Sequence, residues 1–171
     1  TPIRTDATPF SDDQTDAILA DFRRDGYRLI PGVLQPDEVA ALRAAADRVF
    51  DDPRFADNLY APYIAVRLFE TDPVFEEILT REPIITLLER LLGADCHLVA
   101  QNFVRNDPGT AIDTFHVDDT LFFPVGEGME RHDPRVPMPV FLATVQIPLT
   151  DIEADEYGPT QFVPGSHASG R

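Results

Sequence analysis

The apolar side chains change their spacing near Gly93, and this change limits the architectures open to the chain. Before Gly93 the apolar residues recur at helical spacing, as in amphipathic helices. Beyond it they alternate over short stretches that Pro and Gly interrupt, which is typical of strands and turns. Helices followed by short strands and long loops predict an α+β domain built on an antiparallel barrel or jelly roll.

Three helices are expected in the helical part, residues 11–93. Ser11 and Gln14 form the S-x-x-Q pattern of a capping box, which predicts that the first helix begins there. Pro36 suits the first turn of a second helix. A third helix is expected over residues 83–92.

The jelly-roll strands are expected in residues 97–171, after one short strand at 27–30. The expected segments are 97–105, 112–118, 140–149 and 160–163. Alternation is clearest in 140–149, where odd positions from Phe141 to Leu149 are apolar and even positions include Thr144 and Gln146. If the odd face packs on the helices, the even face lines the barrel.

Length and charge narrow the classes of function. The 171 residues suit one domain, 1–171, and the net charge is −16. Such a charge argues against nucleic acid and anionic membranes as partners, since both are bound by clustered cations. No apolar run approaches the roughly 18 residues of a membrane helix. A single cysteine, Cys96, excludes an internal disulfide and fits a cytoplasmic location.

The residues best suited to chemistry are His116 and Asp118. On a strand, residues two apart point to the same face, so one imidazole and one carboxylate can reach the same ion. A triad of two histidines and one carboxylate binds iron(II) and leaves positions open for other ligands. Asp119 points the other way and is not expected to be a ligand. The alternative is a surface strand with a solvated Asp118 and a packed His116.

Three further blocks resemble the phytanoyl-CoA dioxygenase family. They are the stretch DGYRLIPGVL-x-PDEV at residues 25–39, LTD at 149–151, and GPTQFVPGSH at 158–167. Their order and approximate spacing agree with the family, and the resemblance extends from about Phe22 to His167.

The resemblance implies a double-stranded β-helix, a cupin-like jelly roll with helices packed on it, that holds iron(II) and 2-oxoglutarate. His116 and Asp118 match two of the family's metal ligands. The implied enzyme is a dioxygenase that uses O₂, releases succinate and CO₂, and oxidises a small organic substrate. Halogenating relatives lack the carboxylate ligand, so Asp118 favours hydroxylation. A non-catalytic or metal-binding cupin-like protein is the alternative.

Polar residues on the expected strands are candidates for contact with the cosubstrate. They are Gln101, its neighbour Asn102, Thr144 and Gln146, and ordinary hydrogen bonding within a barrel is the alternative for all four. Arg67 and Arg105 are candidates for attracting an anion or for surface ion pairs. The loop at 123–139 is expected to border the substrate pocket, because loops at barrel mouths carry specificity.

The resemblance also implies a distal His ligand and an Arg that pairs with 2-oxoglutarate, both expected beyond Arg171. His167 belongs to a turn motif in the family, and neither it nor Arg171 is the expected substitute. His97 and His132 are expected to serve packing or the surface. An incomplete chain, a partner chain that supplies the missing groups, and a degenerate non-catalytic relative remain the three explanations, and the oligomeric state is left open.

Overall fold

The computed structural model describes residues 3–4, 7–109, 114–116, 128, 133, 135 and 139–168. Within these residues the α-helices are α1 (Asp12–Asp25), α2 (Pro36–Asp51), α3 (Pro73–Glu77) and α4 (Ile84–Leu92). The strands are β1 (Leu59–Ala61), β2 (Ile64–Ala65) and β3 (Phe103–Val104). Short 3₁₀ turns are η1 (Pro53–Asn58), η2 (Leu68–Glu70), η3 (Ile78–Thr80), η4 (Asp155–Tyr157) and η5 (Ser166–Ala168). None of the helices in the described part of the chain has the length and apolarity to cross a membrane.

The three expected helices are confirmed, because each carries its own boundary signals. The Ser11 hydroxyl accepts from the Gln14 backbone N–H at 3.3 Å, and the Gln14 side chain accepts from the Ser11 N–H at 3.0 Å. Helix α1 ends at Gly26, whose φ of 85° suits a residue without Cβ. Helix α2 begins at Pro36 as expected, and α4 begins one residue inside its expected bound.

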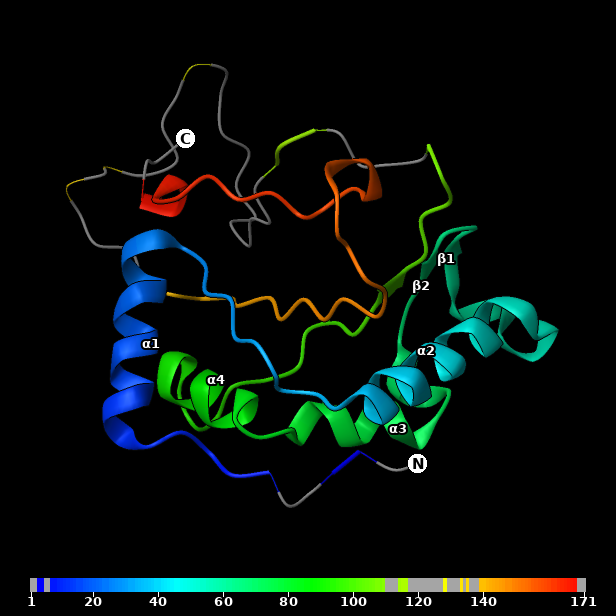
Figure 1. Ribbon diagram of the computed structural model, residues 1–171, viewed down its shortest axis with the longest axis horizontal. Coiled ribbons are helices and arrows are strands. Elements are labelled where there is room, and N and C mark those ends of the chain that lie inside the picture. Colours follow the sequence, from blue (N-terminus) through cyan, green and yellow to red (C-terminus); the bar gives the residue numbers. More distant parts are fainter. Residues whose placement is uncertain are drawn as a thin grey trace.

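The core is built around α2. Its expected apolar face is buried at Leu42, Ala46 and Val49, which cluster with Phe75 of α3 and Ala65 of β2. Figure 1 shows α2 beside α3 on one side of the molecule and α1 beside α4 on the other. The core therefore lies within the helical part of the chain, and the later segments run over one side of it.

A buried ion pair joins the turns around α2. Glu38 and Arg81 are 0% and 4% exposed, and the Arg81 Nη2 lies 3.0 Å from the Glu38 Oε2. The carboxylate also accepts the backbone N–H groups of Arg4 at 2.7 Å and Gln35 at 2.8 Å. Arg81 in turn donates to the carbonyl oxygens of Arg4 and Val33. The pair thereby links the N-terminal arm, the turn before α2 and the turn before α4.

The sheet is small and antiparallel, with strand order β1-β2-β3. Ala65 of β2 is the central residue and pairs with Leu59 on one side and Phe103 on the other. Of the strand expected at 97–105, only β3 is paired, and the hairpin of β1 and β2 was not expected from the sequence. The short length of β3 and the unexpected hairpin have one cause, because a segment forms a strand only where a neighbouring strand supplies hydrogen bonds.

The strands expected at 27–30, 140–149 and 160–163 are wrong for the structure as described, because none of these segments pairs with another described strand. The odd face of 140–149 also does not meet the condition that it packs on the helices. Phe141 is 64% exposed, Val145 and Ile147 are exposed as well, and only Leu149 touches the core. The strand expected at 112–118 lies mostly outside the described residues. Helices with a small antiparallel sheet are thus what the structure shows, and the double-stranded β-helix stays an expectation.

Candidate metal centre

His116 is exposed, and one of its ring nitrogens lies close to a backbone carbonyl. The His116 Nδ1 lies 3.1 Å from the carbonyl oxygen of Thr114. A carbonyl oxygen only accepts, so a hydrogen bond at this distance requires the tautomer with the proton on Nδ1. Metal-binding histidines commonly donate their other N–H to a carbonyl in this way. The contact is therefore compatible with a metal ligand, and metal binding by His116 stays a prediction.

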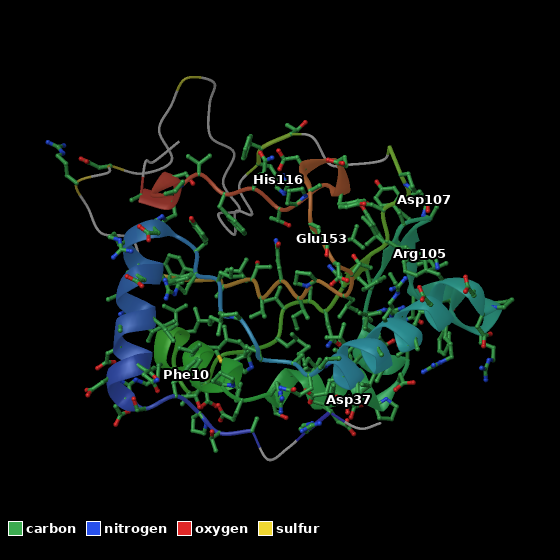
Figure 2. All side chains as sticks on the ribbon, in the orientation of Figure 1. Phe10, Asp37, Arg105, Asp107, His116 and Glu153 are labelled. Carbon is green, nitrogen blue, oxygen red and sulfur yellow. The ribbon has the colours of Figure 1, made fainter. Side chains whose placement is uncertain are left out.

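Asp118 and its neighbour Asp119 lie outside the described residues, so the convergence of His116 and Asp118 on one ion stays a prediction. In the described ranges no three His, Cys, Asp or Glu side chains gather in a way that would hold an ion. Figure 2 shows His116 on the side of the molecule away from Phe10 and Asp37. The candidate centre thus lies apart from the N-terminal arm and the start of α2.

The segment around β3 presents two different faces. Gln101, Phe103 and Arg105 point to the helical layer. Gln101 Nε2 donates to the Phe75 carbonyl at 2.7 Å, and the Phe103 ring lies 5.9 Å from the Phe50 ring. The guanidinium of Arg105 lies 4.2 Å above the centre of the same Phe50 ring. Because strand residues alternate, Asn102 and Val104 face the opposite, open side, and both are exposed.

Gln101 therefore ties β3 to α3 through its amide nitrogen. Its Oε1 is buried and has no hydrogen-bond partner within the described part of the chain. A buried carbonyl oxygen of this kind is usually satisfied by an ordered water or a bound molecule. The contact of Gln101 with a cosubstrate stays a prediction. It would use an amide N–H, because the oxygens of 2-oxoglutarate only accept.

Thr144 and Gln146 are both exposed on the extended segment 140–149. Their exposure leaves them accessible to a small molecule. The neighbouring odd positions are open too, so accessibility by itself does not distinguish the polar face from the apolar one. Their contact with 2-oxoglutarate stays a prediction.

His167 contacts the end of helix α1, as a residue with a structural role does, and was not expected to be a metal ligand. Its Nε2 lies 3.0 Å from the carbonyl oxygen of Arg23 at the end of α1. The adjoining Asp25 has its pKa lowered, first by a hydrogen bond from Arg24 and in smaller part by the charges of Arg24, Arg28 and His167. This agrees with the expectation that His167 belongs to a turn motif. The sequence had signalled the motif but not the helix end that it meets.

The two arginines considered as anion sites are engaged in contacts at the surface. Arg67 donates to the Asp57 carbonyl at 2.9 Å and lies 3.7 Å from the Glu70 carboxylate. Arg105 lies 3.5 Å from Asp51, besides its contact with Phe50. These contacts favour surface ion pairs over anion binding.

Other candidates carry less information. His97 is exposed, as expected. His132 and Arg171 lie outside the described residues, and so does most of the loop at 123–139. The border that this loop forms with a substrate pocket stays a prediction.

Comparisons with known proteins agree with the resemblance seen in the sequence. The family model described as "Phytanoyl-CoA dioxygenase (PhyH)" matches residues 22–171. An ectoine dioxygenase of Stutzerimonas stutzeri (strain A1501) is 29% identical over 155 residues, which are 85% of this chain and 48% of that protein. The chain thus spans about half the length of the curated relative it matches. No solved structure matches the chain.

Proposed function

Because the chain belongs to the phytanoyl-CoA dioxygenase family, we propose that it is part of an iron(II)- and 2-oxoglutarate-dependent dioxygenase that hydroxylates a small organic substrate. The observation that carries the proposal is the family match over residues 22–171. The contact of the His116 Nδ1 with the Thr114 carbonyl is compatible with it, because metal-binding histidines commonly donate their other N–H to a carbonyl.

In this proposal His116 and Asp118 hold the iron. The imidazole Nε2 and the Asp118 carboxylate supply two of the three protein ligands of a facial triad. When bound, iron and 2-oxoglutarate together activate O₂, and the cosubstrate leaves as succinate and CO₂. The protein's own task is to hold the target carbon of the substrate near that centre. Asp118 favours hydroxylation over halogenation, which needs its position vacant.

The proposed contacts to the cosubstrate come from Gln101, Thr144 and Gln146. Because 2-oxoglutarate offers only acceptor oxygens, Gln101 would contact it through an N–H of the amide that also donates to the Phe75 carbonyl. Thr144 and Gln146 are exposed and therefore accessible to a small molecule. We place the third metal ligand and the arginine for the far carboxylate beyond Arg171. We further propose that the complete protein closes the jelly roll that the family implies.

The substrate is proposed only as a class. The relative's name says that it is a dioxygenase acting on ectoine, and 29% identity supports the chemistry more than the substrate. The net charge of −16 supports a small molecule over nucleic acid or an anionic membrane. The cytoplasmic location is proposed on the single cysteine.

Iron binding by matched variants tests the site. The full-length protein is loaded with iron(II) without O₂, and bound iron is measured after gel filtration. We expect His116→Ala and Asp118→Ala to lose most of the iron. His97→Ala and Asp119→Ala are the controls, since each removes the same type of side chain at a position that is not a proposed ligand, and both are expected to keep the iron. Equal retention in all four variants would contradict the proposed ligands.

A further inference from the structure

Two segments from near the two ends of the sequence meet at the end of α1. The Gly165 N–H donates to the Asp25 carbonyl at 2.8 Å, and the His167 Nε2 lies 3.0 Å from the Arg23 carbonyl. In Figure 1 the red turn η5 lies at the end of the blue helix α1. The last carbonyls of a helix have no partner within the helix, so both contacts satisfy groups that otherwise need water. We call this set of contacts the latch.

The latch fits closely around Gly26. A Cβ at that position would lie 2.4 Å from the His167 Nδ1, a distance that no real side chain allows. Next to it the Tyr27 and Phe162 rings stack with centres 4.9 Å apart and planes 7° from parallel. Residues 23–27 and residues 162–167 therefore form the two halves of one contact.

The latch is one of the attachments that the structure describes for residues 139–168, which we call the strap. Among the described residues, hydrogen bonds from the strap to residues 7–109 occur only in the latch. Leu149, in the first half of the strap, packs against the core, and Phe141, Val145 and Ile147 before it are exposed. A segment held by local contacts of this kind can open without global unfolding.

We propose that His167 is a positioning residue whose latch on α1 holds the strap in place beside the site. The proposal rests on the proposed function in one respect, namely that Thr144 and Gln146 of the strap contact the cosubstrate. The latch itself is independent of the chemistry. When His167 releases the Arg23 carbonyl, the strap loses one of the two hydrogen bonds that the structure describes between it and residues 7–109. Leu149 and the Tyr27–Phe162 stack are then left to hold the strap, and with it Thr144 and Gln146.

Hydrogen exchange followed by mass spectrometry on the full-length protein tests the latch. The backbone N–H groups of Gly165, Ser166 and Ala168 are all hydrogen-bonded, so a peptide covering 163–168 reports on it. We expect His167→Ala to speed exchange there about fivefold to tenfold, the loss of one hydrogen bond, with α2 unchanged. His167→Gln keeps an N–H donor at similar reach and should restore slow exchange. Unchanged exchange in His167→Ala, or an equal increase in α2, would overturn the latch.

Two glycines provide a matched pair of variants. Gly26 and Gly32 have similar positive φ values of 85° and 74°, but a Cβ at Gly32 would meet nothing within 4 Å. Both Ala variants share the backbone strain, and only Gly26→Ala displaces the His167 ring. We expect faster exchange at 163–168 in Gly26→Ala alone, with no further increase when His167→Ala is added. Equal exchange in the two glycine variants contradicts the close fit.

The positioning role needs a second readout, the dissociation constant of 2-oxoglutarate for the iron-loaded protein without O₂. We expect His167→Ala to weaken binding several-fold and His167→Gln to restore it. Faster exchange with unchanged affinity would overturn positioning while leaving the latch intact. If the unaltered protein binds no 2-oxoglutarate, the proposed function and the positioning role fail together, and the exchange data judge the latch separately.

Discussion

Removing the Glu38 carboxylate tests how the helical part is held together. Glu38→Ala deletes the partner of Arg81, whose Nη2 lies 3.0 Å from the carboxylate and whose side chain is only 4% exposed. It also leaves the N–H groups of Arg4 and Gln35 without their acceptor. Breaking a buried ion pair by removing one partner costs about 3–5 kcal/mol. For a domain of this size, about 4 kcal/mol lowers the melting temperature by about 8–16 °C.

Urea denaturation followed by far-UV circular dichroism measures this loss, because the chain contains no Trp for fluorescence. The control is Arg48→Ala, which breaks an ion pair with Asp72 that is shorter, at 2.6 Å, but 57% and 28% exposed. Exposed pairs contribute about 0–1 kcal/mol, so this variant should stay near the parent. Replacing both Glu38 and Arg81 by apolar residues of similar size should cost less than Glu38→Ala. Equal costs for Glu38→Ala and Arg48→Ala would refute the reasoning.

Three further predictions concern local features. Ser11→Ala removes the capping hydroxyl of α1 and should cost about 1 kcal/mol in urea denaturation, whereas an unchanged midpoint would contradict the cap. Arg54 hydrogen-bonds to Asp52 and holds the pKa of that carboxyl below its ordinary value, so Arg54→Ala should raise the Asp52 pKa in a carbon-13 NMR titration. The stabilisation from this pair is present above the ordinary carboxyl pKa and fades as pH falls through the lower folded-state value, so a stability difference that persists in acid would contradict it. Arg67 has a left-handed φ of 53°, so Arg67→Gly should cost less in unfolding free energy than Arg67→Val by about 1–2 kcal/mol, and equal costs would contradict this.

Helix boundaries could be predicted because their signals are local. Ser11 with Gln14, Pro36 and Gly93 each lie within one turn of the boundary that they mark, and the structure places the ends of helices there. The apolar face of α2 was equally predictable, since helical spacing brings Leu42, Ala46 and Val49 to one side whatever the partner is.

Pairings between distant residues could not be predicted in the same way. The alternation in 140–149 predicts a strand only when a neighbouring strand is present, and the described residues provide none. Nothing near Glu38 in the sequence points to Arg81, and Glu38 looks like an ordinary charge in the first turn of a helix. The contact of His167 with Arg23 joins residues 144 positions apart, although both stretches were recognisable as family blocks.

Only part of the candidate site could be predicted, because the contacts of its side chains depend on the fold. His116 is recognisable from the H-x-D pattern and its family context, whereas its contact with the Thr114 carbonyl had no signal in the sequence. Gln101 and Asn102 were both named as polar strand residues. Alternation along a strand puts the two side chains on opposite faces, but only the contact of Gln101 with Phe75 shows which face meets the helices.

The most direct test of the central claim is an anaerobic titration of the full-length protein with iron(II) and 2-oxoglutarate, followed by admission of O₂. The account predicts a weak visible charge-transfer band when both are bound, and succinate that forms only after O₂ is added. The band and the succinate should both be absent in His116→Ala and present in His97→Ala. A protein that binds iron(II) but gives neither band nor succinate would contradict the proposed dioxygenase and favour a metal-binding protein on the same scaffold.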